Sequence, residues 1–352
     1  MGLGVMNKHT FLVFILALLC SLLLTGKWKL MTNRWFLLGG ISGFLIVLPN
    51  IMWQMANHYP SLEFYSNISR YKNVFTPPTA FMAGQITGMS PFTVPVWLAG
   101  FVYLLVAKKM REVRFLAVLF LGLLSFMMLT GTSRSDRMIF AYPAVFAGGA
   151  IFYETLIAQY NVRWLKSVLI LVLFSGLAVA LPVILPYFDY ETVHAQVTRL
   201  GLNTEIEKGK KPPLPQILAD RIGWEEKYAL VLKAYLNLSS DEKKDAIIAA
   251  GNYGDAGAIE LFGKKDTLPS VVSGHNNYSL WSKERLHGSI ILRLEQEKYF
   301  GRLKELFEEV VPCEGEFSSP YVSSHENHLK VFLCRKPKMP LQEMLEKGKS
   351  YF

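Results

Sequence analysis

Two arginines lie close together in a short polar segment between two long apolar stretches. Residues 131–137 read Gly-Thr-Ser-Arg-Ser-Asp-Arg, which places Arg134 and Arg137 three positions apart. A guanidinium group binds a phosphate through two parallel hydrogen bonds. Lys8, which precedes the first apolar stretch, adds a third cation. These residues predict a site for a lipid-linked phosphate; contact with lipid headgroups without any reaction is the alternative.

Aromatic and polar side chains also collect after the second apolar stretch. Trp53 ends that stretch, His58, Tyr65 and Arg70 lie in the long loop that follows, and Tyr142 stands near the start of the fifth stretch. Aromatic residues commonly form a belt at the membrane interface. Because the loop is long enough to cover a cavity, we also consider these five residues candidates for contact with a substrate.

The sequence has no motif of a known soluble enzyme. It lacks a phosphate-binding loop, a nucleophile elbow and a metal-binding helix pair. The glycine-rich residues 251–257 predict a tight turn between a strand and a helix. His275, His287, His325 and His328 are scattered among polar residues, and they predict no metal site. No cofactor is indicated, although a divalent cation stays open, and no catalytic base is assigned.

The elements that must position these residues are mostly membrane helices. Hydrophobic residues make up 51% of the chain and form long runs up to residue 185, which is unusual for a soluble protein. Since roughly 20 apolar residues cross a bilayer, we predict an α-helical transmembrane bundle of about six helices. They cover residues 10–25, 35–53, 79–107, 115–130, 138–158 and 168–185. Gly84, Gly88, Pro91 and Pro95 predict a kink in the third helix, and the first and fourth are short.

Charge is divided unevenly along the chain. Residues 1–186 contain 14 Lys and Arg against four Asp and Glu, whereas residues 187–352 contain 23 against 24. In the first part, nine basic residues lie in loops on one side (Lys27, Lys29, Arg34, Lys108, Lys109, Arg111, Arg114, Arg163 and Lys166) and four in loops on the other (Arg70, Lys72, Arg134 and Arg137). The positive-inside rule predicts a multi-pass protein of the inner membrane with its C-terminal domain outside the cytoplasm. Basic residues in such short loops do not indicate a nucleic-acid partner.

We predict two domains: a transmembrane domain at residues 1–186, followed by a soluble α/β domain at residues 187–352. Short apolar runs at residues 245–250, 270–273, 289–294 and 329–333 predict strands, and residues 220–236, 256–262 and 299–310 predict helices. This alternation predicts a partly parallel sheet. Cys313 and Cys334 both lie in this domain, and a disulfide between them is a candidate that sequence spacing does not decide.

Four segments resemble a known group of membrane enzymes. Residues 49–64 (PNIMWQMANHYPSLEF), 137–143 (RMIFAYP), 251–259 (GNYGDAGAI) and 273–278 (SGHNNY) are similar to segments of bacterial polytopic glycosyltransferases of the protein O-mannosyltransferase-like group. That group includes the aminoarabinose lipid A transferases and the Rgt-type lipopolysaccharide glycosyltransferases. The resemblance extends over nearly the whole chain and rests on the order of the segments.

This resemblance implies the C-terminal part of a GT-C-like membrane domain followed by an extracytoplasmic domain. It also implies transfer of a sugar from a polyprenyl-phosphate donor to a lipid, glycan or protein acceptor on the outer face of the membrane. Arg134, Arg137 and Lys8 would then stabilise the leaving phosphate. The acidic motif that carries the group's base is absent. We therefore expect an N-terminally truncated enzyme with little activity of its own.

Two other classes of protein are considered. The first is a non-enzymatic membrane-anchored protein whose outer domain binds a glycan or a partner protein. The second, a transporter subunit, is disfavoured because the spans carry almost no ionisable residues, which transport pathways usually need. The exception is Glu154, near the predicted cytoplasmic end of its helix. The oligomeric state stays open.

Overall fold

The computed structural model describes residues 1–131, 134–185, 187–202, 205, 207–208, 212–265 and 268–351. The chain forms two compact units. The helical unit contains Met1–Tyr59 and Val74–Tyr187, and the C-terminal unit contains Pro60–Asn73 and Phe188–Phe352. The division near residue 187 lies one residue from the predicted domain boundary. Residues 60–73, predicted as a loop of the membrane domain, belong to the C-terminal unit instead.

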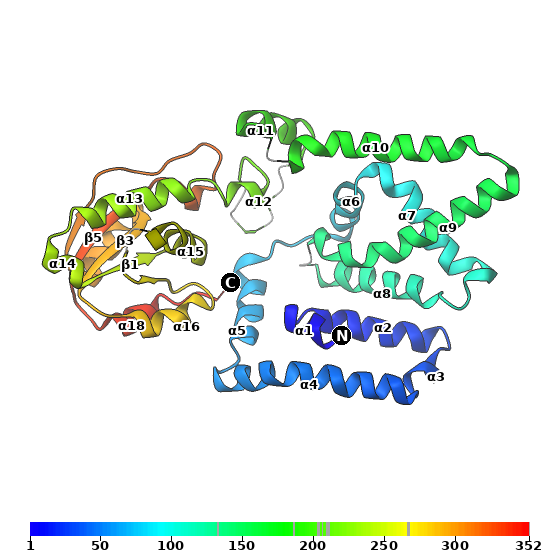
Figure 1. The fold of residues 1–352 in the computed structure, drawn as a ribbon, viewed down its shortest axis with the longest axis horizontal. Coiled ribbons are helices and arrows are strands. Elements are labelled where there is room, and N and C mark those ends of the chain that lie inside the picture. Colours follow the sequence, from blue (N-terminus) through cyan, green and yellow to red (C-terminus); the bar gives the residue numbers. More distant parts are fainter. Residues whose placement is uncertain are drawn as a thin grey trace. The chain divides into compact units, whose positions relative to one another are not determined.

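Helices make up the described part of the helical unit (Figure 1). They are α1 (Gly2–Asn7), α2 (Phe11–Leu24), α3 (Trp28–Met31), α4 (Arg34–Ala56), α6 (Pro78–Gly88), α7 (Val94–Val106), α8 (Phe115–Thr130), α9 (Tyr142–Tyr160) and α10 (Trp164–Ile184). Short 3₁₀ segments cover Pro91–Thr93, Lys108–Met110 and Ser135–Ala141. The long apolar runs of this part of the sequence account for the α-helices, since a helix satisfies its own backbone hydrogen bonds in an apolar environment.

Three helical stretches in the described part of the chain are long and apolar enough to cross a membrane. They are Arg34–Ala56, Ser135–Tyr160 and Trp164–Leu181, with 23, 26 and 18 residues. Helices α2 and α8 have 14 and 16 residues, or roughly 21 and 24 Å at 1.5 Å per residue, against a hydrocarbon core of about 30 Å. The structure therefore supports a membrane protein with three such helices, or up to four if the bent α6–α7 pair counts as one. The described residues thus contain fewer helices of membrane-spanning length than the six spans predicted from the sequence.

The predicted kink in the third apolar stretch is confirmed as a full break. Pro78–Gly88 and Pro91–Val106 meet at an angle of 84°. Pro91 has no backbone N–H to continue the first helix, and Ser90 before it has a φ of 69°, which no helical residue adopts. The change of direction at this break is larger than a kink within one continuous helix.

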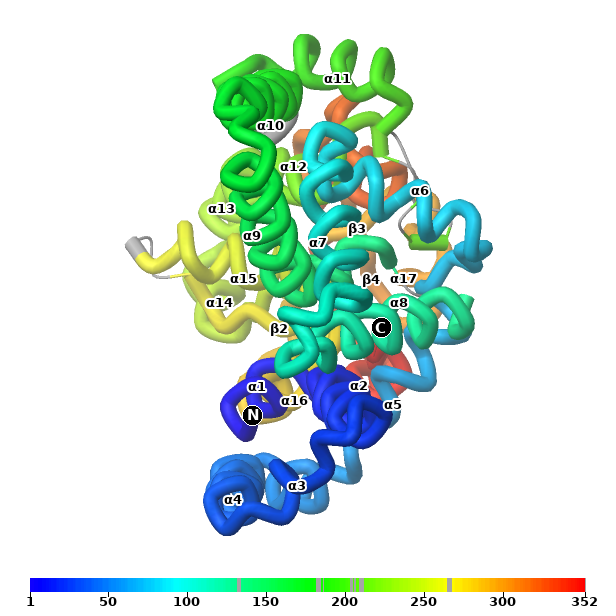
Figure 2. Tube along the Cα trace, turned by 90° about the vertical axis from the view of Figure 1, so that its right-hand side faces the viewer, coloured from blue at the N-terminus to red at the C-terminus, as the bar shows by residue number. Residues whose placement is uncertain are grey.

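The core of the helical unit lies where α7 crosses α9 (Figure 2). A Cβ atom on Gly100 would lie 1.9 Å from the carbonyl oxygen of Val145 and 2.3 Å from the nitrogen of Gly149. A Cβ on Gly149 would lie 2.2 Å from the carbonyl oxygen of Val96. Small residues at such crossings let two helix backbones approach closely, which gives van der Waals packing that apolar solvent does not compete with.

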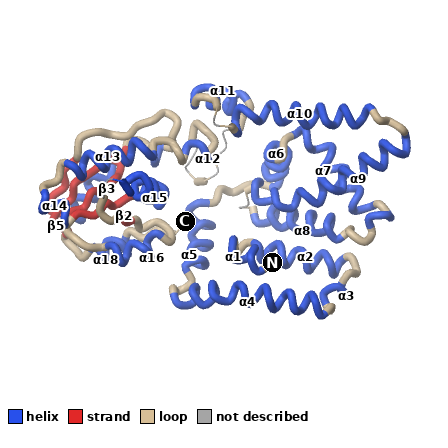
Figure 3. Tube along the Cα trace, viewed as in Figure 1, coloured by secondary structure: helices blue, strands red, loops and turns tan. Residues whose placement is uncertain are grey.

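The C-terminal unit combines a sheet with short helices (Figure 3). Its helices are α5 (Pro60–Asn67), α11 (Tyr190–Arg199), α12 (Gln216–Ala219), α13 (Trp224–Leu236), α14 (Ser240–Lys244), α15 (Tyr253–Phe262), α16 (Tyr278–Ser282), α17 (Phe300–Leu306) and α18 (Leu341–Lys347), with a π-helical turn at Ile68–Lys72. Its strands are β1 (Ala246–Ala250), β2 (Val271–Val272), β3 (Ile290–Gln296), β4 (Phe307–Pro312) and β5 (Leu329–Pro337).

The five strands form a mixed sheet in the order β2-β1-β3-β5-β4. Strand β1 is parallel to both β2 and β3, while β5 is antiparallel to β3 and β4. Helices α13 and α15 contact the sheet, and residues of α17 and α18 pack on a cluster that includes Ile247, Ile291 and Phe332. The predicted partly parallel α/β domain is thus confirmed.

The prediction of one helix over residues 299–310 is wrong beyond Leu306. Helix α17 ends there, and Phe307–Pro312 forms the edge strand β4. The apolar spacing of Phe307, Val310 and Val311 fits a helix as well as a strand, so periodicity alone does not separate the two. The ladder with β5, which pairs Phe307 with Pro337 and Val310 with Cys334, decides for the strand.

The candidate disulfide between Cys313 and Cys334 is not formed, since both cysteines are free. Cys334 is paired with Val310, while the N–H of Cys313 donates to the carbonyl oxygen of Val331 at 2.8 Å. The two cysteines are therefore three residue pairs apart along the ladder, or roughly 10 Å. Because side chains alternate between the faces of a strand, this odd offset also directs them to opposite faces.

Candidate functional site

The segment that carries both predicted arginines is held on α6. The side-chain amide of Gln85 donates to the carbonyl oxygen of Ser135 at 3.1 Å, and the hydroxyl of Tyr142 donates to Oε1 of Gln85 at 3.0 Å. A Cβ on Gly84 would lie 2.7 Å from Cβ of Ser135, so α6 and the segment are in close contact. Gln85 thus fixes both ends of the 3₁₀ segment Ser135–Ala141. It was missed at the sequence level, although a glutamine in an apolar stretch signals a hydrogen-bond partner.

Tyr142 is part of the core rather than an open substrate surface. Its side chain is 1% exposed. Its ring lies edge-on to those of Trp97 and Phe120, with centroid distances of 5.5 and 5.2 Å. Because Tyr142 is packed in this way and donates a hydrogen bond to Gln85, we assign it the role of positioning the arginine segment.

The two arginines have different surroundings. Arg134 forms a two-point ion pair with Asp136, at 2.8 and 3.2 Å, and both side chains are exposed. Arg137 is half-buried, and its backbone N–H donates to the carbonyl oxygen of Arg134 at 3.2 Å. A phosphate near Arg134 would compete with Asp136 for the guanidinium group. Residues 132 and 133 lie outside the described part.

Lys8 lies at the same end of the helical unit as the arginine segment. It follows α1 directly and is exposed. The next helix, α2, brings the ring of Phe14 to 5.7 Å from that of Phe140, at the end of the arginine segment. His9 lies 2.9 Å from Asn50 of α4, measured from Nε2 to Oδ1, so the last part of α4 also belongs to this end.

The aromatic candidates are divided between the two units. Trp53, in the last turn of α4, is 40% exposed. His58 and Tyr59, just after that helix, have φ angles of 61° and 56°, a left-handed conformation that costs non-glycine residues roughly 1–3 kcal/mol. Tyr65 and Arg70 lie in the C-terminal unit.

The acidic residues do not supply an obvious base beside the arginines. Glu112 pairs with Lys27 at the other end of α2 and α8, and Glu63 pairs with Lys349 in the C-terminal unit. Asp136 is already bound to Arg134. Among the described residues, no group of three or more His, Cys, Asp or Glu side chains is placed to hold a metal ion.

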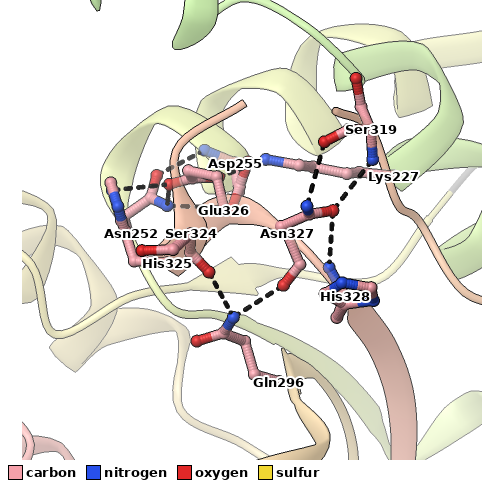
Figure 4. A network of polar contacts seen from close by, with 10 residues as sticks. All are labelled: Lys227, Asn252, Asp255, Gln296, Ser319, Ser324, His325, Glu326, Asn327 and His328. Atoms are coloured by element: carbon pink, nitrogen blue, oxygen red, sulfur yellow. Dashed lines mark hydrogen bonds and ion pairs between the residues drawn. The ribbon is translucent and has the colours of Figure 1, made fainter. Parts of the chain in front are cut away.

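A second polar cluster lies in the C-terminal unit, where α13 meets the start of α15 (Figure 4). Lys227 is 2% exposed, and its ammonium donates to Asp255 at 2.7 Å and to Glu326. Asn252 donates to both carboxylates at 2.9 and 2.8 Å. Gln296, at the end of β3, donates to the carbonyl oxygens of Ser324 and Asn327 and so fastens the loop that carries Glu326.

Burial dominates the electrostatics of this cluster. It raises the pKa of Asp255 to about 6, with the charge of Glu326 adding to the effect and Lys227 opposing it. Burial alone would lower the pKa of Lys227, but the two carboxylates outweigh it and the net shift is upward. One buried cation thus holds two carboxylates, of which Asp255 is buried and Glu326 is partly exposed. Of the predicted surface histidines nearby, the side chain of His328 is 67% exposed and pairs with Glu316.

In the part of the chain that the structure describes, the fold is mostly helical, with three apolar helices of membrane-spanning length and a small mixed sheet at the C-terminal end. No family model, curated protein or solved structure matches the chain.

Proposed function

We propose that this protein is an integral membrane glycosyltransferase that takes a sugar from a polyprenyl-phosphate donor and transfers it to a lipid, glycan or protein acceptor. The observation that carries the proposal is the cationic end of the helical unit. There, Arg137 and Arg134 lie on a segment fixed by Gln85 and Tyr142, and Lys8 is exposed at the same end. A preorganised cation is useful where charge develops in a reaction.

The chemistry assigns a clear task to these cations. The bond between the anomeric carbon and the phosphate oxygen breaks, and the lipid phosphate leaves with the electron pair. An acceptor hydroxyl forms the new bond to the anomeric carbon and loses its proton. Arg137 stabilises the charge that develops on the phosphate. The group that receives the proton is not assigned, because Asp136 is held by Arg134.

We also propose that the protein crosses the inner membrane six times with its C-terminal unit outside the cytoplasm. In this arrangement α2, α8 and the bent α6–α7 pair cross together with the three longer helices. Support comes from the ion pair between Lys27 and Glu112, which joins two strongly basic segments at one end of the helical unit. The arginine segment lies at the end where α2 begins.

The proposal is tested with the full chain in lipid nanodiscs and a radiolabelled polyprenyl phosphate. Arg137→Ala should weaken binding about 10- to 100-fold, since a hydrogen bond to a charged group contributes roughly 1.5–3 kcal/mol. Arg163→Ala, an exposed arginine at the start of α10, is the control and should bind like the unchanged protein.

Transfer is then measured with a labelled polyprenyl-phosphate sugar and membrane lipids as acceptors. Transfer that Arg137→Ala abolishes and Arg163→Ala preserves supports an enzyme. Binding without any transfer would favour the non-enzymatic membrane-anchored protein. If Arg137→Ala bound the polyprenyl phosphate as well as Arg163→Ala does, the proposed phosphate site at Arg137 would be refuted.

A further inference from the structure

The C-terminal unit contains a cavity of about 360 Å³ on one face of its sheet. This volume is within the usual range of small-molecule sites, roughly 300–1,000 Å³. Helices α17 and α18 form the opposite wall through Leu303, Leu306, Leu341 and Met344. All lining residues belong to the C-terminal unit, so the cavity is complete within it.

The cavity runs along this face of the sheet and reaches the carboxyl ends of the three parallel strands. Its lining includes Ala250 and Gly251 at the end of β1, Ser273 and Gly274 just after β2, and Glu295 near the end of β3. The chain runs from β1 to β2 on one side and then returns to place β3 on the other side of β1. Ligands of open α/β sheets bind at such a reversal of strand order, outside the carboxyl ends of the strands.

An arginine in the central strand distinguishes this cavity from a simple packing gap. Arg293 of β3 is paired with Ala249 on one side and Phe332 on the other, on the face that also carries Ile291 and Glu295. Its guanidinium forms an ion pair with Glu295 at 2.8 Å, but its buried Nε–H has no hydrogen-bond partner among the described residues. An unpaired buried donor is costly, and the small side chain of Ala249 leaves space beside it.

The charges around the cavity favour an anion. Arg293, Arg302 and Lys347 line it, against the single carboxylate of Glu295. Lys347 also pairs with Glu343, one turn earlier on α18, at 2.8 Å. The rest of the lining is mostly apolar, with buried Ile247, Ile291 and Phe307 among it. A fully polar anion would leave this apolar wall without a partner.

We propose that this cavity binds a small amphipathic anion, a carboxylate or phosphate on an apolar group, with the anion at Arg293 and the apolar part against α17 and α18. The site is separate from the proposed transfer site, and neither depends on the other. The apolar wall favours a ligand with an apolar group, and Arg293 favours one with a negative charge. A neutral alcohol lacks the charge and inorganic phosphate lacks the apolar group, so both should bind weakly.

The test uses the full chain in nanodiscs and a decanoate that carries a photoreactive diazirine, with labelled peptides identified by mass spectrometry. We expect saturable labelling of peptides from α17 and α18. Decanoate and decyl phosphate should both compete, and the ratio of their potencies measures the preference for carboxylate over phosphate. Decanol and inorganic phosphate should compete at least tenfold less well. Labelling confined to the membrane helices, or equal competition by decanol, would overturn the proposal.

Arg293→Met should reduce this labelling at least tenfold, and Arg293→Lys should restore part of it. Arg285→Met is the matched control, because Arg285 also forms an ion pair at 2.8 Å and is similarly exposed, at 33% against 29%, but does not line the cavity. If Arg293→Met fails to fold, Ala249→Leu decides the question by filling the space beside the arginine without changing any charge. Unchanged labelling in that variant would also overturn the proposal.

Discussion

At the scale of single residues, the Lys227 cluster shows how burial changes the behaviour of a charge. Lys227 and Asp255 are 2% and 4% exposed, and Glu326 completes a group with two carboxylates for one ammonium. Desolvation of a charge is costly, and removal of one partner leaves the other uncompensated. Burial is the main reason that the proton on Asp255 is bound more tightly in the folded protein, and the negative charge of Glu326 adds to this effect.

Asp255→Asn should therefore change how stability depends on pH. The folded pKa of Asp255 is about 6, above its ordinary value of 3.8. Its contribution to stability is fully present below pH 3.8 and is lost as the pH rises through about 6. Between these values the unchanged protein should lose on the order of 2–3 kcal/mol relative to the variant. Hydrogen exchange of the Ile248 amide in the full chain, corrected for its intrinsic rate, measures this difference.

The control for that experiment is Asp241→Asn, because the Asp241 side chain is 93% exposed and pairs only at the surface with Lys244. It should follow the unchanged protein at every pH. Parallel pH profiles for the Asp255 variant and the unchanged protein would show that Asp255 does not titrate in this range.

At the scale of elements, the sequence predicts what local patterns determine. The apolar runs, the strands β1, β2, β3 and β5, and the break near Pro91 follow from composition, periodicity and proline chemistry. Strand β4 was missed because its formation depends on a ladder with the distant β5. For the same reason, the ties of Gln85 to Ser135 and Tyr142, 50 and 57 residues away, could not be predicted from the sequence.

The crossing of α7 and α9 yields a prediction in which two similar changes have opposite effects. Replacement of a helical glycine by alanine normally stabilises a protein by about 0.4–1 kcal/mol. Gly122 of α8 has no atom within 4 Å of an added Cβ, so Gly122→Ala should follow this rule. Gly100→Ala should instead destabilise by about 3 kcal/mol, because its Cβ meets the backbone of Val145 and Gly149. Thermal unfolding in detergent compares them; stabilisation by both would refute the close crossing.

At the scale of the whole molecule, the segment Pro60–Asn73 constrains the topology. It leaves the helical unit after α4, yet it packs within the C-terminal unit. Lys72 pairs with Glu207 at 3.0 Å, the ammonium of Lys208 donates to the carbonyl oxygen of Arg70 at 2.9 Å, and Lys349 pairs with Glu63 at 3.0 Å. Groups in one compact unit share a side of the membrane. The loop after α4 and the C-terminal unit must therefore be on the same side, which the charge distribution predicts to be the outer one.

This sidedness can be measured with a protease added to right-side-out spheroplasts. An epitope tag at the C-terminus should be lost, because the C-terminal unit is expected outside. A tag inserted after Lys109, an exposed residue of a basic segment, should survive until the membrane is broken. Nine basic residues against four favour this orientation, and the contacts of Pro60–Asn73 add that the loop and the C-terminal unit cannot be separated by the bilayer. Protection of the C-terminal tag together with loss of the internal one would reverse the orientation. It would also place the Arg137 end of the helical unit in the cytoplasm, where the proposed outer-face transfer could not occur.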